Sequence, residues 1–222
     1  MRIIVFKKLL FCGGIALTSV FAPVFADIAK AEENKGWYFT AGAGINDIQD
    51  TDWEYTTGGT KYTGEQKYDG GFSSEVGFGY DFGNRWRTEL TWTRDAGDLD
   101  AVTVDNAGVS VTGDFDVRID AIGLGAYYDL SEDTKFTPYI GGGIGWAKVT
   151  TEDGTIAGVN VEGGSEEALG YQFKVGGSYS LDDSKDVYIE GGYAGTEDIT
   201  SNDVKYSNIG AWVGRVGMRF KF

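Results

Sequence analysis

The segment "VGRVGMRFKF" (residues 213–222) decides the fold of this chain, because its side chains alternate strictly between apolar and polar. A period of two residues is typical of a β-strand whose two faces meet different surroundings. The alternation continues to the last residue, whereas most chains fray and become polar at their ends. We therefore expect a strand that is paired along its whole length. Its apolar face carries Val216, Met218, Phe220 and Phe222, and its other face carries Arg215, Arg219 and Lys221.

The same alternation recurs in seven other segments, so the sequence predicts eight strands. Short, turn-rich connections at 83–85, 131–135 and 182–186 alternate with long ones. An even number of strands, with short turns at one end and long loops at the other, predicts an antiparallel up-and-down meander. The seven segments are 37–45, 72–82, 86–94, 122–130, 136–149, 169–181 and 187–195, and the long connections span roughly 46–70, 95–115, 150–167 and 196–205.

The polarity of the two strand faces separates a membrane protein from a soluble one. One face is an uninterrupted row of aromatic and aliphatic residues, and the other carries Glu, Arg, Lys and many of the 35 glycines. A packed soluble core would bury these charges at a high cost in free energy. In a membrane barrel with a lipid-facing exterior, these charges would face a small polar lumen, so this cost would not arise. The predicted fold class is therefore all-β, an eight-stranded antiparallel up-and-down transmembrane β-barrel. A secreted β-sandwich or lipocalin-like carrier is the alternative.

The N-terminus has the features of a secretory signal peptide. Arg2, Lys7 and Lys8 precede an apolar run that closes on "VFA", with cleavage expected after Ala26. A retained transmembrane anchor is the alternative, but glycines and a proline interrupt the run. The single cysteine lies in this segment, so no disulfide framework is expected in the exported chain. The expected organisation is a signal peptide (1–26), a short periplasmic segment (27–35) and a bacterial outer membrane β-barrel domain (36–222).

The charge of the chain excludes one class of partner. It has 34 acidic and 19 basic residues, a net charge of −15. Nucleic-acid binding requires clustered Lys and Arg, so no nucleic-acid partner is expected. No segment after the signal has about 18 consecutive apolar residues, so a membrane protein of this composition would have to be a barrel.

The absence of histidine limits the chemistry available to the chain. Without histidine, and without a cysteine beyond the signal, Ser-His-Asp, Cys-His and ordinary zinc sites are excluded. The acidic stretch 95–105 has the composition of a calcium-binding loop, but no EF-hand pattern fits it, and a solvated loop is preferred. We predict no catalytic residue, no cofactor and no metal site.

Seven charged residues fall on the inner face of the predicted barrel. The interior of an eight-stranded barrel is only just wide enough for side chains, so mixed charges there should pair with one another. We expect a salt-bridged closure of the lumen; a gate that opens when the pairs break is the alternative. This lumen network comprises Glu75, Arg87, Glu89, Lys174, Glu190, Arg215 and Arg219.

The long connections are strongly acidic. Residues 46–70, 95–116, 150–167 and 195–205 contain twenty acidic residues against three basic ones. Such a surface should repel anionic polymers and attract divalent cations, including those that bridge lipopolysaccharide to outer membrane lipid. The acidity could equally serve only to keep the loops soluble.

Three segments resemble the OmpA-like, opacity-type outer membrane β-barrel family: "TPYIGGGIGW" (137–146), "YQFKVGGSYSL" (171–181) and the terminal "VGRVGMRFKF". The resemblance implies insertion by the barrel-assembly machinery and a role as adhesin, surface antigen, envelope stabiliser or minor porin. The terminal strand is similar to the signal which that machinery reads, carried here by Val216, Met218, Phe220 and Phe222. Larger members have a C-terminal peptidoglycan-binding domain that is missing from this sequence, so cell-wall tethering is not expected.

Two functions follow from these features. The first is a non-enzymatic structural, adhesion or surface-antigen role, in which the barrel displays long acidic extracellular loops to a partner that the sequence does not identify. The second is a narrow porin-like channel for small solutes or cations with a salt-bridged lumen. The first is preferred because of the length and the acidic composition of the loops.

Overall fold

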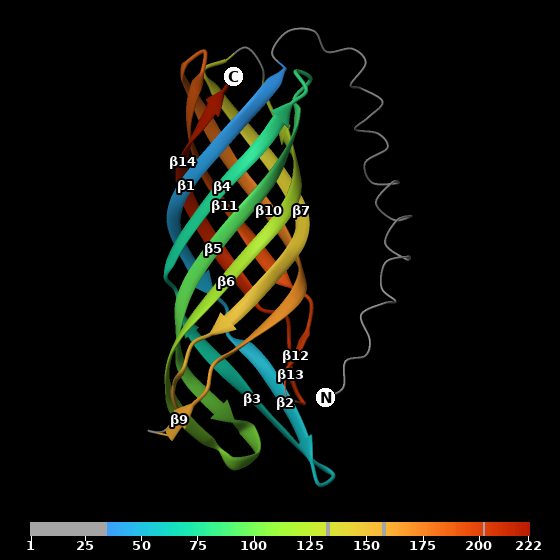
Figure 1. Ribbon diagram of the computed structural model, residues 1–222, viewed down its shortest axis with the longest axis vertical. Coiled ribbons are helices and arrows are strands. Elements are labelled where there is room, and N and C mark those ends of the chain that lie inside the picture. Colours follow the sequence, from blue (N-terminus) through green and yellow to red (C-terminus); the bar gives the residue numbers. More distant parts are fainter. Residues whose placement is uncertain (1–34, 132–133, 157–158, 202) are drawn as a thin grey trace, which may run out of the picture.

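Antiparallel strands make up nearly all of the computed structural model, which describes residues 35–131, 134–156, 159–201 and 203–222 (Figure 1). Long strands cross obliquely around a tall barrel, with the C-terminus at one end and extended hairpins at the other. The predicted signal peptide and the segment 27–34 lie outside the described residues. The barrel strands are β1 (Gly36–Ile48), β4 (Phe72–Asp81), β5 (Trp86–Val104), β6 (Val109–Asp129), β7 (Phe136–Thr151), β10 (Gly164–Asp182), β11 (Lys185–Thr196) and β14 (Gly210–Lys221).

The eight barrel strands form a closed ring. Each pairs with the next in the order just given, and β14 pairs back onto β1. At this seam Val216 lies opposite Ala43, and Phe220 lies opposite Phe39. Closure pairs the backbone groups that an open sheet would leave free at its edges, a requirement inside a bilayer. The predicted eight-stranded antiparallel barrel is confirmed, and strand closure explains why the terminal segment is ordered.

Large apolar side chains cover the outside of the barrel. Leu90, Ile144 and Phe173 are each about half exposed, at 54%, 45% and 57% of their surface. Exposed aromatic residues lie at both ends of this belt, where amphipathic rings favour the membrane interfaces. Trp92, Trp146 and Trp212 lie toward the hairpin end, and Phe136, Tyr179 and Phe222 lie toward the short turns. Among the described residues, no helix is long and apolar enough to cross a membrane.

The long connections differ from the expectation of loops, because they are largely folded into strands. The first contains the hairpin β2 (Thr51–Thr57) and β3 (Thr60–Asp69), and the second is an extension of β5 and β6 around a short 3₁₀ turn, Asp105–Ala107. The third contains β8 (Gly154–Ile156) and β9 (Val159–Val161), and the fourth contains β12 (Ile199–Ser201) and β13 (Val204–Tyr206). Threonine, tyrosine and valine favour strands, so pairing continues beyond the membrane.

These hairpins also pair with one another. β13 pairs with β2 of the first hairpin, with Lys205 opposite Glu54, and β3 pairs with the extension of β5. Asn46 helps to fix the position where the first hairpin leaves the barrel: its amide donates hydrogen bonds to the carbonyl oxygens of Phe72 and Ala96, at 2.9 and 3.0 Å. Three of the four long connections therefore form one continuous sheet, β12-β13-β2-β3-β5, and the third, β8 with β9, pairs with β6 instead (Figure 1).

Candidate functional site: the charged and aromatic lumen

Strand alternation carries all seven charged residues of the predicted lumen network into the barrel. Their side chains come from five of the eight strands, β4, β5, β10, β11 and β14. Each residue is at least 93% buried, although the outside of the same strands is exposed. The structure thus places Glu75, Arg87, Glu89, Lys174, Glu190, Arg215 and Arg219 together on the inner face.

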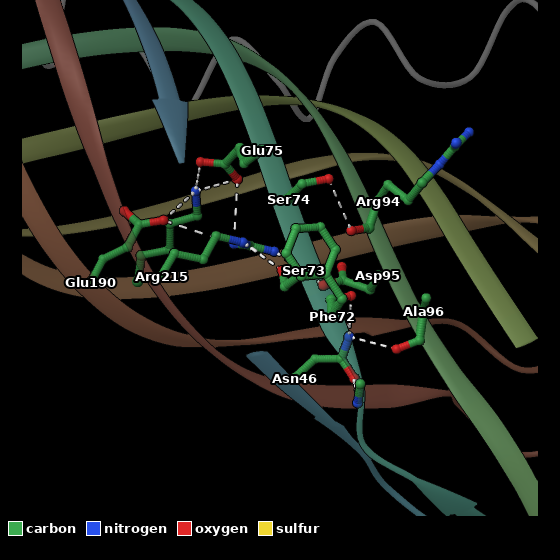
Figure 2. Close-up of polar contacts among 12 residues, drawn as sticks. Asn46, Phe72, Ser73, Ser74, Glu75, Arg94, Asp95, Ala96, Glu190 and Arg215 are labelled. Carbon is green, nitrogen blue, oxygen red and sulfur yellow. Dashed lines mark hydrogen bonds and ion pairs between the residues drawn. The ribbon is translucent and has the colours of Figure 1, made fainter. Parts of the chain in front are cut away.

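The centre of the lumen is an ion cluster around the Lys174 ammonium. Its Nζ lies 2.5 and 2.6 Å from the two carboxylate oxygens of Glu75, and 3.2 Å from Glu190 Oε1. Because β10 and β4 lie on opposite sides of the ring, the Lys174–Glu75 pair spans the lumen. Arg215 joins the cluster, with Nη1 3.4 Å from Glu75 Oε2 and 3.8 Å from Glu190 Oε1. Glu75, Glu190 and Arg215 converge in Figure 2.

Arg215 extends the cluster toward the extracellular end. Its Nε donates to Ser73 Oγ at 2.7 Å, and its Nη2 lies 3.3 Å from Asp95 Oδ1 (Figure 2). Neither Ser73 nor Asp95 was predicted as a member of the lumen network. The sequence nevertheless indicates that both side chains point inward, because each residue lies an even number of positions from a predicted member on the same strand.

Toward the periplasmic end, Arg87 is held between two tyrosines. Its guanidinium carbon lies 4.5 Å from the ring centroids of both Tyr127 and Tyr139, which is cation–π geometry. Its Nε donates to Asp129 Oδ1 at 3.2 Å. The sequence placed Arg87 inside but did not identify its partners, which lie on β6 and β7 at positions fixed only by register.

Arg219 occupies a second mixed site at the same end. Its Nη1 lies 3.5 Å from Asp186 Oδ2, and its guanidinium carbon lies 5.2 Å from the centroid of the Tyr38 ring. Lys221 reaches the other oxygen of Asp186 at 2.8 Å. Tyr139 connects this region to the central cluster, because its hydroxyl donates to Glu190 Oε2 at 2.9 Å.

Glu89 differs from the other six members. It is buried, but its carboxylate makes no ion pair with any described residue, and its Oε2 has no hydrogen-bond partner among them. The sequence analysis includes Glu89 in a network whose charges are expected to pair with one another. The structure instead assigns the direct contacts of Arg215 and Arg219 to Glu75, Glu190, Asp95 and Asp186.

Glycines create the space that the lumen tyrosines fill. All four of these tyrosines lie directly opposite a glycine on the neighbouring strand, and a Cβ atom at that glycine would overlap the tyrosine side chain. This pairing explains much of the high glycine content on the inner face, since a ring folded across the strand needs a neighbour without a side chain. The pairs are Tyr38–Gly79, Tyr127–Gly141, Tyr139–Gly176 and Tyr188–Gly217.

The extracellular half of the interior contains two apolar clusters, which the sequence does not predict. Two buried clusters lie above the ion cluster, because the extracellular hairpins need a core of their own. A cavity of about 60 Å³ borders Thr91, Asp95 and Ala147, and one of about 280 Å³ lies among the hairpins beside Tyr68 and Phe115. The clusters comprise Ile48, Ala168, Ile199, Ile209, Ala211 and Val213, and Leu99, Phe115 and Val117.

An apolar belt around a closed ring of strands, with charges inside, defines an integral β-barrel of the bacterial outer membrane. The chain belongs to the outer membrane protein β-barrel domain family, whose model matches residues 13–220.

Comparison with solved structures supports the same fold. OprG from Pseudomonas aeruginosa matches with a TM-score of 0.55 at 18% identity, over 87% of this chain and 99% of that one. Neisserial surface protein A matches with a TM-score of 0.51 at 20% identity, over 86% of this chain and all of that one. The outer membrane protease OmpT from Escherichia coli matches with a TM-score of 0.53 at 10% identity, over 84% and 97%. No curated protein sequence matches. At these identities the likeness concerns the fold alone.

Proposed function

We propose that the protein is a non-enzymatic outer membrane protein with a structural, adhesion or surface-antigen role, in which a closed barrel holds a folded extracellular sheet. The observation that carries this proposal is the occupied lumen. The Lys174–Glu75 pair spans its centre, and apolar residues such as Ile209 fill it above. A water-filled path would have to displace both the ion pair and these apolar residues. The barrel therefore serves as an anchor, and the exposed sheet serves as the functional surface.

The extracellular sheet suits recognition because its hairpins are joined. The first and fourth hairpins pair through β2 and β13, and two ion pairs flank this contact: Lys61–Glu54 at 2.7 Å and Lys205–Asp198 at 2.8 Å. A rigid sheet loses less conformational entropy on binding than four free loops would. Its acidic composition favours a basic partner over an anionic one.

The proposal of a non-enzymatic role rests on the chemistry of the lumen. Apart from Glu89, its carboxylates are engaged with Lys and Arg, and general-base catalysis near neutral pH most often uses histidine, which the sequence lacks. One of the structural neighbours is a protease, so the fold alone decides nothing about activity.

The two cavities favour a second candidate, a narrow channel for small solutes or cations. Both touch Ile209, and they follow one another from the hairpins toward the ion cluster. A liposome-swelling assay on purified protein separates the candidates. The anchor role predicts no solute uptake above protein-free liposomes, whereas robust flux would favour the channel.

The display role is tested on whole cells. Replacing residues 52–68 by a short turn should leave the barrel folded, shown by heat-dependent mobility on SDS gels. The same change should abolish recognition by antibodies raised against intact cells and reduce adhesion to immobilised cationic polymer. Full recognition by the shortened protein would contradict the proposal.

A further inference from the structure

Three basic side chains form a group on the outer surface at the hairpin end of the apolar belt. Arg94 on β5, Arg118 on β6 and Lys148 on β7 point outward from neighbouring strands. They are linked by register, since Arg94 lies opposite Asp120 and Asp120 lies opposite Lys148. In Figure 2 the side chain of Arg94 points away from the Glu75–Arg215 group of the lumen. We call Arg94, Arg118 and Lys148 the basic patch.

The basic patch is an exception on an acidic surface. Where the apolar belt ends on three of the other strands, the next outward residue is acidic: Asp47 on β1, Glu167 on β10 and Glu197 after β11. The three lysines of the hairpins are each within 4 Å of a carboxylate: Lys61 of Glu54, Lys67 of Glu65, and Lys205 of Asp198. Basic residues are thus grouped on three neighbouring strands: Arg94 and Lys148 lie in one row, and Arg118 lies one outward position beyond it.

The two guanidinium groups of the patch are held in place by a shared carboxylate. Arg94 Nε lies 2.7 Å from Asp120 Oδ1, and Arg118 Nε lies 3.2 Å from Asp120 Oδ2. Arg118 Nη1 contacts Glu152 at 3.2 Å, and the Arg94 guanidinium lies 5.2 Å from the centroid of the Trp92 ring. The side chains remain 46% and 36% exposed, so the outer edges of both guanidinium groups stay available.

The position of Trp92 fixes the depth of the patch in the membrane. Tryptophan favours the interface between hydrocarbon and headgroups, and Arg94 follows it by one outward position on the same strand. The Lys148 ammonium follows Trp146 in the same way. The basic patch therefore lies at the level of the headgroups of the outer leaflet, where phosphates of the surface glycolipid are found.

We propose that the basic patch binds a phosphate group of lipopolysaccharide directly, without a bridging cation. Two preoriented guanidinium groups and an ammonium suit a phosphate dianion, because guanidinium forks bind phosphate oxygens in pairs. The proposal does not depend on the display role of the hairpins, since the patch lies on the barrel wall below them. Its failure would leave the display role intact.

The experiment measures retention of fluorescent lipid A by refolded full-length protein in mixed micelles containing EDTA. The patch variant is R94Q/R118Q/K148Q, and the matched control is K61Q/K67Q/K205Q, which removes the same charge from the hairpins. Basic residues near an anionic membrane surface each contribute measurably to binding, so the patch variant should lose about tenfold or more in affinity. The control should bind as the wild type does, and dephosphorylated lipid A should bind wild type and patch variant equally weakly.

Three results would overturn the proposal: full binding by the patch variant, equal loss in the control, or wild-type binding that occurs in micelles without EDTA but not in micelles with it. The last would instead indicate a divalent cation bridge from the acidic surface. Folding of each variant is checked by heat-dependent gel mobility. Should the triple variant fail to fold, K148Q alone gives the answer, because Lys148 makes no ion pair with any described residue, and a loss of about threefold is expected.

Discussion

Lys174 and Glu75 meet across the full width of the lumen, with Nζ 2.5 Å from Oε1, although 99 positions separate them in the sequence. They come from strands on opposite sides of the ring, so their contact ties two walls that share no backbone hydrogen bond. Glu190 and Arg215 complete the cluster. A contact of this kind both fills the lumen and fixes the shape of the barrel.

Replacing Lys174 by methionine should destabilise the folded barrel strongly. The change leaves Glu75 and Glu190 buried without their central cation, and removal of one partner from a buried ion pair costs about 3–5 kcal/mol. Urea unfolding of the refolded protein in lipid vesicles measures the change in free energy of unfolding. The control is Lys205→Met, which breaks an exposed pair with Asp198 and should have little effect. Similar losses in both variants would contradict this account of the lumen.

Replacing Gly217 by alanine should weaken the seam between β14 and β1. A Cβ atom there would overlap the Tyr188 side chain and the Ala41 carbonyl oxygen. Overpacking of this kind costs about 1–3 kcal/mol. Gly214→Ala on the same strand is the matched control, because a Cβ there meets no atom within 4 Å, and it should change stability by less than about 0.5 kcal/mol. Denaturant unfolding compares the two, and equal stabilities would show that the tyrosine–glycine fit is not tight.

The second hairpin should be less stable at neutral pH than in mild acid. Asp98 lies opposite Asp116 on β6 and Asp69 on β3. Partial burial, together with these neighbouring carboxyl groups, raises the pKa of Asp98 above its ordinary value of 3.8. An acid whose pKa is raised by folding disfavours the folded form once it is charged, so its contribution to stability improves as the pH falls through the raised value.

A titration of the Asp98 carboxyl by NMR checks this expectation. Asp116→Asn should lower the pKa of Asp98 and reduce amide hydrogen exchange in the hairpin at pH 7. Asp100→Asn provides the control, because Asp100 is also acidic and exposed on β5 but does not lie opposite Asp116. An unshifted Asp98 pKa in the Asp116→Asn protein would refute the like-charge explanation.

Phe222→Ala should reduce assembly in cells more than stability in vitro. The resemblance of the terminal strand to an assembly signal predicts that the barrel-assembly machinery reads its outward row, in which Phe222 is 72% exposed. Phe136→Ala is the control, since Phe136 is another exposed phenylalanine at the short-turn end of the barrel. The measurements are the folded fraction in outer membranes and the refolding yield of purified protein. Equal assembly of both variants would contradict a signalling role for Phe222.

Much of the barrel could be predicted from the sequence because alternation is a local property. The period of two assigned Lys174 and Arg215 to the inner face, and the spacing of turns gave the strand count. The partners of these residues depend on register and on the width of the ring. No local signal therefore indicates that Lys174 reaches Glu75, or that Arg87 lies between Tyr127 and Tyr139.

The extracellular half was harder to predict because its structure depends on contacts between hairpins. Tyr206 lies opposite Trp53, although the two belong to connections at opposite ends of the sequence. Isolated two-stranded hairpins are only marginally stable, so the strands here are supported by pairing with their neighbours and by the buried cluster around Ile48 and Ile209. The composition predicted acidic loops. That these segments form a sheet depends on pairing between hairpins far apart in the sequence, which composition does not indicate.

The most direct test of the closed lumen is the ionic current through single wild-type barrels in a planar lipid bilayer. The Lys174–Glu75 cluster and the apolar layer above it predict no stable current steps at any applied voltage that the bilayer withstands. Folded insertion is verified in the same samples by heat-dependent gel mobility. Reproducible, ohmic current steps from the folded wild-type protein would contradict the closed barrel and establish a channel.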